Sequence, residues 1–148
     1  MERQKFIILT LNEECYAIPI DYIHSIERTQ PVTRIPNTEG FVKGVINLRG
    51  IITPVIDLRE RMGFEAKPLD EVSRIIITNR SQESIGLIVD GADDVIEINN
   101  DDIEPPPETI SENYRDYIEG VIKHEQRLIV LLSLEHVFEA DFVKQHHV

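Results

Sequence analysis

Short apolar runs rich in Val, Ile and Leu recur along the chain, separated by polar segments that contain Gly, Pro, Asn or Asp. Such runs are typical of β-strands, and the polar breaks are typical of turns. The pattern predicts strands over 5–11, 15–20, 44–48, 50–58, 74–79 and 85–91, with a final pair of strands within 116–134. Pro19 cannot donate a ladder hydrogen bond, so it marks either an edge strand or the end of its strand.

Other segments have a less regular pattern. Residues 21–29 suit either a helical turn that begins at Asp21 or a strand. The polar stretch 59–73 contains Gly and Pro, which predicts a loop. Residues 93–110 predict a short strand followed by an acidic loop stiffened by three consecutive prolines. Residues 133–143 carry apolar side chains at helical spacing, so we expect an amphipathic helix that closes the chain.

The whole pattern predicts about nine or ten short strands and one clear helix, which is typical of small β-barrels or of a sandwich. The polar stretch 59–73 could divide the chain into two lobes. Each lobe would be too small to bury an adequate core alone. We therefore expect the lobes to share a hydrophobic core and to leave a groove between them.

Composition and charge narrow the classes of function. The chain has 148 residues, of which 41% are hydrophobic, enough for one domain or two very small ones. Its net charge is −12 and no basic face is visible, which argues against binding to nucleic acid or to an anionic membrane. No apolar run approaches the roughly 18 residues of a membrane span, and the N-terminus lacks signal-peptide features. We therefore expect a cytoplasmic protein without direct membrane insertion.

Side chains able to catalyse a reaction or bind a metal are present, but they form no known local pattern. Cys15 is the only cysteine and lies in a predicted strand, where a small buried hydrophobe is the expected role. The five histidines lack metal-ligand spacing, apart from the terminal pair His146 and His147. A calcium loop laid from Asp90 fails at its glycine and glutamate positions. We therefore expect no enzyme activity, no metal and no cofactor, although a site built from residues distant in sequence stays open.

The segment "NLRG" at 47–50 lies at the tip of the predicted hairpin between 44–48 and 50–58. Gly50 can adopt the positive φ that a type I turn with a bulge requires, and Asn47 can hydrogen-bond the turn backbone. Gly44 opens the first strand. These three residues have plain structural roles in a hairpin.

Arg49 differs, because no turn requires an arginine. It could be a solvated charge, or it could brace the fold by pairing with a carboxylate such as Asp57. It could also orient a partner's carboxylates or peptide carbonyls with its planar guanidinium fork. In that last case the neighbouring Leu48 and Ile51 would form the apolar floor of a recognition surface.

The segment "GFVKGVINLRGIITPVIDLRERMG" resembles the signature segment of the CheW family of bacterial chemotaxis adaptors. Further matching segments follow in register: "VTRIPNT" before it, then "IGLIVDGADDVIEI", "IEPPPE" and "YIEGVIKHEQRLIVLLSLEHVF" after it. Together they extend from about residue 5 to residue 142. The loop 59–73 and the last few residues follow no family pattern.

The resemblance implies a mostly β fold with two small SH3-like five-stranded β-barrel subdomains that share a hydrophobic core, intertwined as one CheW-like domain over residues 1–148. It implies no catalytic activity. Members couple membrane chemoreceptors to the histidine kinase CheA. The implied partners are the regulatory domain of CheA, which pairs through barrel ends, and the cytoplasmic tip of methyl-accepting chemoreceptors, which lies against the groove between the barrels. A stand-alone adaptor recruited to receptor arrays at the inner face of the membrane is the direct interpretation.

The resemblance also assigns candidate partner-binding residues. Those of the hairpin are Asn47, Leu48, Arg49 and Gly50, with Gly44 at its base; those near the receptor groove are Ile23, Ser25 and Ile26, to which the later segment adds Val89 and Val95. Ser25 departs from the acidic residue that some members carry at this position. The strand pattern alone places Ile23 and Val89 in the core more readily than on a contact surface.

A second interpretation belongs to a different class, a ligand-binding β-barrel or small enzyme that uses the groove between the lobes. Partner dependence separates the two. An adaptor binds a receptor hairpin and a kinase domain, whereas the alternative binds or converts a small molecule.

Overall fold

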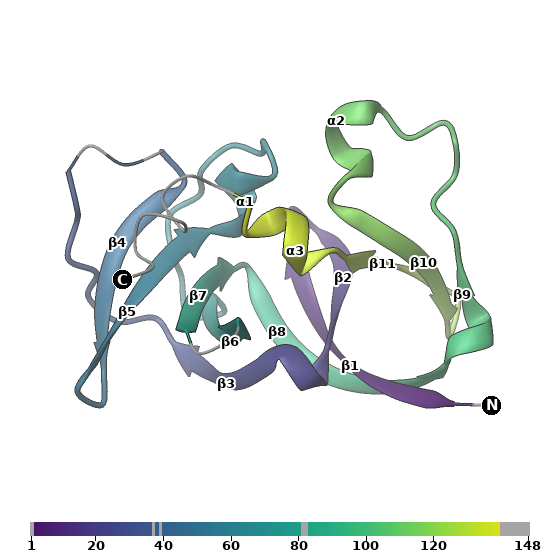
Figure 1. The fold of residues 1–148 in the computed structure, drawn as a ribbon, viewed down its shortest axis with the longest axis horizontal. Helices are drawn as coiled ribbons and strands as arrows, with labels where there is room; N and C mark the ends of the chain where they lie inside the picture. Colours follow the sequence, from purple (N-terminus) through teal and green to yellow (C-terminus); the bar gives the residue numbers. More distant parts are fainter. Residues whose placement is uncertain (1, 37, 39, 81–82, 140–148) are drawn as a thin grey trace.

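The computed structural model describes residues 2–36, 38, 40–80 and 83–139, which form two β-sheets and a few short helices (Figure 1). The six-stranded sheet has the order β8 (Gly91–Asn99), β1 (Arg3–Leu11), β2 (Glu14–Pro19), β11 (Arg127–Leu132), β10 (Ile118–His124) and β9 (Ile103–Glu104). The five-stranded sheet has the order β3 (Ile23–Arg28), β6 (Arg74–Arg80), β7 (Glu83–Val89), β5 (Ile51–Asp57) and β4 (Val42–Leu48). The helices are α1 (Leu58–Arg61), α2 (Glu112–Arg115) and α3 (Leu134–Val137), with single 3-10 turns η1 (Ile20–Tyr22) and η2 (Asn100–Asp102).

Each sheet curls on itself. In the six-stranded sheet the edge strands β8 and β9 are consecutive in the chain and are joined by the turn η2, so β9 continues β8 after a bend. In the five-stranded sheet Thr33, which follows edge strand β3, pairs with Val45 of the opposite edge strand β4 through two backbone hydrogen bonds of 2.9 Å. The expected pair of small barrels is confirmed, with β9 as a short additional strand.

Three apolar clusters fill the molecule. One lies within the six-stranded sheet, around Phe6 and Ile8, and a second within the five-stranded sheet, around Ile75 and Ile77. The third, the shared core, joins side chains from both sheets with those of α1 and α3: Leu9, Leu11, Tyr16, Ile18, Val42, Ile56, Leu58, Met62, Ile76, Ile85, Leu87, Val89, Leu132, Leu134, Val137 and Phe138. The predicted shared core is therefore present.

Alternation along the strands explains how one strand serves two cores. Ile75 and Ile77 of β6 point into the barrel, whereas Ile76 between them points into the shared core. Successive side chains of a strand face opposite sides, so a strand that is covered on both sides has a continuous apolar sequence. The run "IIIT" is thus buried throughout.

The two barrels are also interleaved along the chain. β1 and β2 belong to the six-stranded sheet, β3 to β7 build the five-stranded sheet, and β8 to β11 return to the first. Pro19 ends β2, which lies inside its sheet, so of the two predicted roles the strand end is confirmed and the edge strand is wrong. Cys15 is half-buried against the cluster of its own sheet.

Several predictions for irregular segments are wrong or incomplete. Residues 21 and 22 belong to η1 and residues 23–28 form β3, so the strand alternative is confirmed for most of the segment 21–29. The predicted loop 59–73 is wrong at its start, because residues 59–61 belong to α1. The Asp57 carboxylate caps this helix by accepting a hydrogen bond of 3.0 Å from the Arg59 backbone N–H. The predicted acidic loop, which ends at residue 110, is followed by the unpredicted helix α2 before β10 begins.

The predicted closing helix over 133–143 is only the four-residue α3 within the described residues, and residues 140–143 lie outside them. Arg61 binds the C-terminal end of α3. Its guanidinium donates to the carbonyl oxygens of Val137 at 2.8 Å and His136 at 3.0 Å, in the last turn of the helix, and to that of Glu139 at 3.0 Å just beyond it. The same guanidinium lies over the rings of Phe41 and Tyr117.

Candidate functional site

The hairpin tip between β4 and β5 is a two-residue turn. Leu48 pairs with Ile51, and both turn residues have positive φ, 50° at Arg49 and 88° at Gly50. This is a type I′ turn, so the expected type I turn with a bulge is wrong. The Asn47 side-chain oxygen accepts a hydrogen bond of 2.8 Å from the Gly50 N–H, which confirms its predicted role in holding the tip.

Positive φ at Arg49 belongs to this tight turn and is not in itself a mark of function. The turn between β1 and β2 has the same conformation at Asn12 and Glu13, and the turn between β10 and β11 has it at Glu125 and Gln126. Two-residue turns of this kind match the twist of the paired strands. The turn fixes the backbone conformation at Arg49, and with it the direction in which the side chain leaves the backbone.

Gly44 at the base of the hairpin is required by a close approach. Its φ is 137°, and a Cβ there would lie 1.9 Å from the Thr33 carbonyl oxygen. That carbonyl accepts the hydrogen bond from Val45 that joins the two edges of the sheet. Gly44 therefore sets the shape of the base of the hairpin.

The Arg49 side chain is 66% exposed and pairs with Glu27 of β3, at 3.1 Å between Nη2 and Oε2. The alternative in which Arg49 pairs with Asp57 is wrong, because Asp57 lies at the other end of β5, buried, and caps α1. Hydrogen bonding by Arg49 lowers the pKa of the Glu27 carboxyl. An ion pair in which one partner is this exposed contributes little to folding stability. The exposure of Arg49 also leaves its guanidinium accessible to another carboxylate.

Two isoleucines beside Arg49 form the exposed apolar part of the tip. Ile51 is 64% exposed and Ile52 is 66% exposed, whereas Leu48 is buried in the cluster inside the barrel. Of the two residues expected to form the apolar floor of a recognition surface, Ile51 is exposed and Leu48 is not. Sequence reasoning missed Ile52. Ile52 lies opposite the exposed Asn47, and cross-strand partners face the same side, which is a signal for its exposure. The same rule does not account for Ile51, which lies opposite the buried Leu48.

The remaining candidates lie at different depths. Ile26 on β3 and Val95 on β8 are exposed, at 39% and 49%. Ser25 is half-buried, and Ile23 is half-buried against the shared core. Val89 is 1% exposed within that core, so it has no surface for a partner in this conformation. The structure brings β3 and the hairpin tip together through Glu27, whereas Val95 belongs to the other sheet.

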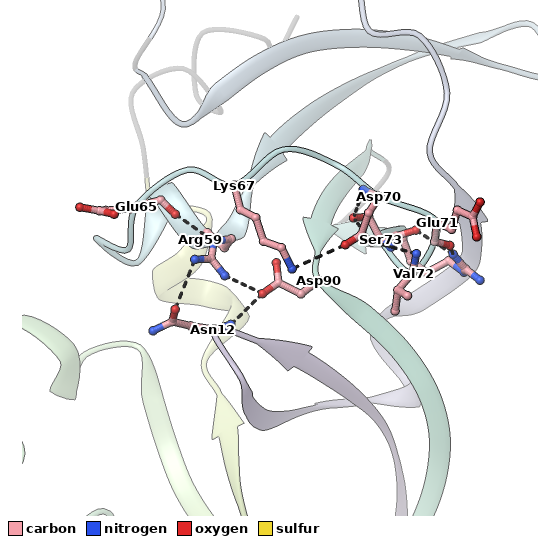
Figure 2. A network of polar contacts seen from close by, with 10 residues as sticks. Asn12, Arg59, Glu65, Lys67, Asp70, Glu71, Val72, Ser73 and Asp90 are labelled. Carbon is pink, nitrogen blue, oxygen red and sulfur yellow. Dashed lines mark hydrogen bonds and ion pairs between the residues drawn. The ribbon is translucent and has the colours of Figure 1, made fainter.

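A polar network joins the two barrels near the β1–β2 turn (Figure 2). Arg59 Nη1 lies 2.6 Å from Asp90 Oδ2, and both side chains are only 13% exposed. The same carboxylate oxygen accepts from the Asn12 N–H at 2.8 Å, while Arg59 donates to the Asn12 side-chain oxygen at 3.2 Å and to the Glu65 carbonyl at 2.9 Å. These contacts tie α1, the β1–β2 turn and the β7–β8 connection together, and sequence reasoning missed them because the partners are far apart in the chain.

A cavity of about 450 Å³ lies where the two sheets meet, as the expected groove requires. It is lined by Pro19 and Tyr22 on one side, by Asn79 of β6, and by Glu119, Leu132, Leu134, Glu135 and Phe138. Among the described residues no group of three His, Cys, Asp or Glu side chains is placed to hold a metal ion. The pair His146 and His147 lies outside those residues. In the same part of the chain, every helix is too short or too polar to span a bilayer.

Comparison with known proteins adds an independent observation. The family model of the CheW-like domain matches residues 5–142. The chain is 38% identical over 138 residues to a chemotaxis protein CheW of Bacillus subtilis, covering 93% of this chain and 88% of that protein. It is 35% identical to a chemotaxis protein CheW of Helicobacter pylori, covering 93% and 83%. The crystal structure of the scaffolding protein TtCheW from Thermoanaerobacter tengcongensis superposes with a TM-score of 0.86 at 36% identity and covers 95% of each chain.

Proposed function

The chain belongs to the CheW family, and from this premise we propose that it is a non-catalytic chemotaxis adaptor that couples membrane chemoreceptors to the histidine kinase CheA in the cytoplasm. Its partners are the regulatory domain of CheA and the cytoplasmic tip of methyl-accepting chemoreceptors. The names of its relatives, chemotaxis and scaffolding proteins, support this proposal. The protein acts by holding two partners together, and it needs no cofactor to do so.

The hairpin tip is the observation that carries the proposal. Arg49, Ile51 and Ile52 are all more than half exposed, yet they lie on a turn fixed by the Asn47–Gly50 hydrogen bond. Apolar side chains displayed on a rigid element lose little conformational freedom when a partner covers them. An arginine among them can orient a partner's carboxylates or carbonyls. Together these features describe a recognition surface that is built before the partner arrives.

The candidate residues divide by role under this proposal. Arg49 contacts a partner directly, with Ile51 and Ile52 as apolar neighbours. Ile26 and Val95 are exposed enough to contact the receptor tip, each from a different barrel. The others shape the surface from beneath: Asn47 and Gly50 fix the turn, Leu48 anchors it in the barrel, Gly44 sets its base, and Ile23, Ser25 and Val89 support β3 and the shared core.

Reconstitution tests the proposal. The purified chain is added to the cognate kinase and to receptor cytoplasmic fragments, and the rate of kinase autophosphorylation is measured with each component omitted in turn. We expect receptor control of the kinase only when all three are present, and binding of the chain to each partner separately. An adaptor role is ruled out if the chain binds neither the kinase regulatory domain nor the receptor fragment.

A further inference from the structure

A second cavity, of about 720 Å³, opens at the end of the five-stranded barrel opposite the hairpin tip. β4 begins and β5 ends beside it, at Val42 and Asp57, whereas Arg49 lies at the other ends of the same two strands. Strands of this length span roughly 20 Å, because each residue adds about 3.3 Å. The cavity is therefore separate from the tip surface, and we call it the mouth cavity.

The floor of the mouth cavity is apolar. Val42 and Ile88 are almost fully buried beneath it, and Leu69 at its rim is 48% exposed. The other apolar lining residues are Val32, Ile35, Pro36, Ala66 and Pro68. A volume of this size lies within the range of about 300–1,000 Å³ that small-molecule sites occupy.

The balance of acidic and basic residues in the lining of the cavity is opposite to that of the whole chain. The chain has 27 acidic and 15 basic residues, whereas the described lining carries Arg34, Lys43 and Lys67 against a single acid, Asp57. The Asp57 carboxylate is occupied as the cap of α1, and burial together with nearby Glu60 raises its pKa. Among the described residues that line the cavity, cations therefore outnumber carboxylates three to one.

Two of these cations have partners outside the lining. Lys43 pairs with Glu60, while Lys67 Nζ lies 3.7 Å from Asp70 Oδ2, with both side chains about half exposed (Figure 2). A contact this long and exposed holds the ammonium only weakly. Arg34 is exposed on the opposite wall. Arg34 and Lys67 are thus the cations most able to turn toward an anion.

Both walls of the cavity are anchored. One wall is held by the Thr33–Val45 pairing and by a hydrogen bond of 3.1 Å from the Thr38 hydroxyl to the Ile35 carbonyl. The other is held where Arg59 binds the Glu65 carbonyl and where the Asp70 carboxylate accepts the N–H groups of residues 72 and 73 (Figure 2). Where the described residues of the walls are held in this way, less ordering is needed when a ligand enters.

We propose that the mouth cavity binds a small organic anion, a carboxylate carried on an aliphatic chain. The chain packs against Val32, Val42 and Ile88, and the carboxylate lies between Arg34 and Lys67. The site belongs to a class of function that adaptor activity does not include. It does not rest on the proposed partners, and each can fail without the other.

Octanoate is the probe, titrated into the full chain labelled with ¹⁵N and followed by NMR. We expect saturable shifts confined to residues 32–43 and 66–69, with a Kd of about 0.1–1 mM, the affinity expected for a ligand of this size. Octanol should bind at least tenfold more weakly because it lacks the charge, and inorganic phosphate at least tenfold more weakly because it lacks the chain. Equal binding of octanol, equal binding of phosphate, or no saturation by octanoate overturns the proposal.

Paired variants test the named cations. Arg34→Gln with Lys67→Gln should weaken octanoate binding at least tenfold. Arg3→Gln with Lys123→Gln removes the same charge from exposed positions of the other sheet and should change binding less than twofold. Equal loss in both double variants would show that only net charge matters, and no loss in either would show that the cations do not hold the anion. Either result overturns the assignment.

Discussion

Arg49 and Glu27 lie 3.1 Å apart across the two edge strands of the five-stranded barrel, the arginine on the hairpin after β4 and the glutamate on β3. The pair joins the two elements that carry most of the candidate partner-binding residues. The glutamate side chain is largely covered, at 18% exposure, while the arginine is 66% exposed. The guanidinium therefore has one side held by the fold and another side open to a partner.

Arg49→Ala should weaken binding to a partner by about five- to a hundredfold, the range for a central interface arginine that contributes roughly 1–3 kcal/mol. Its melting temperature should stay within about 2 °C of the parent, because an exposed ion pair adds little to folding. Arg49→Lys should recover only part of the affinity, since an ammonium lacks the planar fork. Titration against both partners and thermal melts on the same samples measure both quantities.

Glu27→Gln is the control for Arg49, because it breaks the same ion pair and leaves the guanidinium in place. It should keep the binding that Arg49→Ala loses. If the two variants lose affinity equally, the pair itself shapes the surface and Arg49 does not contact the partner. A loss of melting temperature that matches the loss of binding would instead assign Arg49 to the fold.

Ile51→Ser with Ile52→Ser should reduce partner affinity at least tenfold and leave the fold intact. Both side chains are more than 60% exposed, so folding buries little of their surface, whereas a partner would cover them. Leu128→Ser is the matched control, because Leu128 is 62% exposed on the other sheet. Isothermal titration against the kinase regulatory domain and the receptor fragment compares the two. Equal losses of affinity in the Ile51/Ile52 double variant and in Leu128→Ser would show that the hairpin tip is not part of the interface.

Gly44→Ala should strongly destabilise the protein, because its Cβ would fall 1.9 Å from the Thr33 carbonyl oxygen and its φ is 137°. We expect a loss of about 2–4 kcal/mol in the free energy of unfolding, seen in urea denaturation. Gly40→Ala is the control in the neighbouring loop, where a Cβ meets no atom within 4 Å, and it should change stability by less than about 0.5 kcal/mol. Similar free energies of unfolding for the two variants would show that the Thr33–Val45 pairing can shift to accept a Cβ at Gly44 without loss of stability.

Arg59→Met should cost about 2–4 kcal/mol of folding stability, because it leaves the largely buried Asp90 carboxylate without its cation. Asp90→Leu should cost a similar amount for the reciprocal reason. The double variant should lose clearly less than the sum, since it removes both charges together. Chemical denaturation of the four proteins gives the coupling free energy. Simple additivity would mean that the pair does not hold the barrels together.

A fragment of residues 1–62 should not fold. It contains β1 and β2 of one barrel and β3, β4 and β5 of the other, so it lacks strands that lie next to its own in both sheets. The shared core would also lose the side chains contributed by β6, β7 and β11. Circular dichroism and thermal melting of the fragment check this. A soluble fragment that melts cooperatively would show that one barrel is stable without the other.

Strand positions were predictable because their signal is local. A strand covered on one face alternates between buried and less buried residues, as around Gly44, and a strand covered on both faces has a continuous apolar run, as in "IIIT". Both patterns can be read from neighbouring residues in the sequence. The hairpin tip was located for the same reason, through Asn47 and Gly50. Its turn type was not, because Arg49 gives no sign that it will adopt a positive φ; the register of the two strands imposes it.

The sequence by itself determined a mostly β chain with short strands, a shared apolar core and an arginine at the tip of a hairpin. The tertiary structure decided everything that depends on partners far apart along the chain. It paired Arg49 with Glu27, placed Arg59 against Asp90, bound Arg61 to the C-terminal end of α3, turned Ile52 outward and buried Val89. The physical reason is range: backbone conformation and alternation act between neighbours, whereas ion pairs, caps and burial are fixed only when the sheets close and pack.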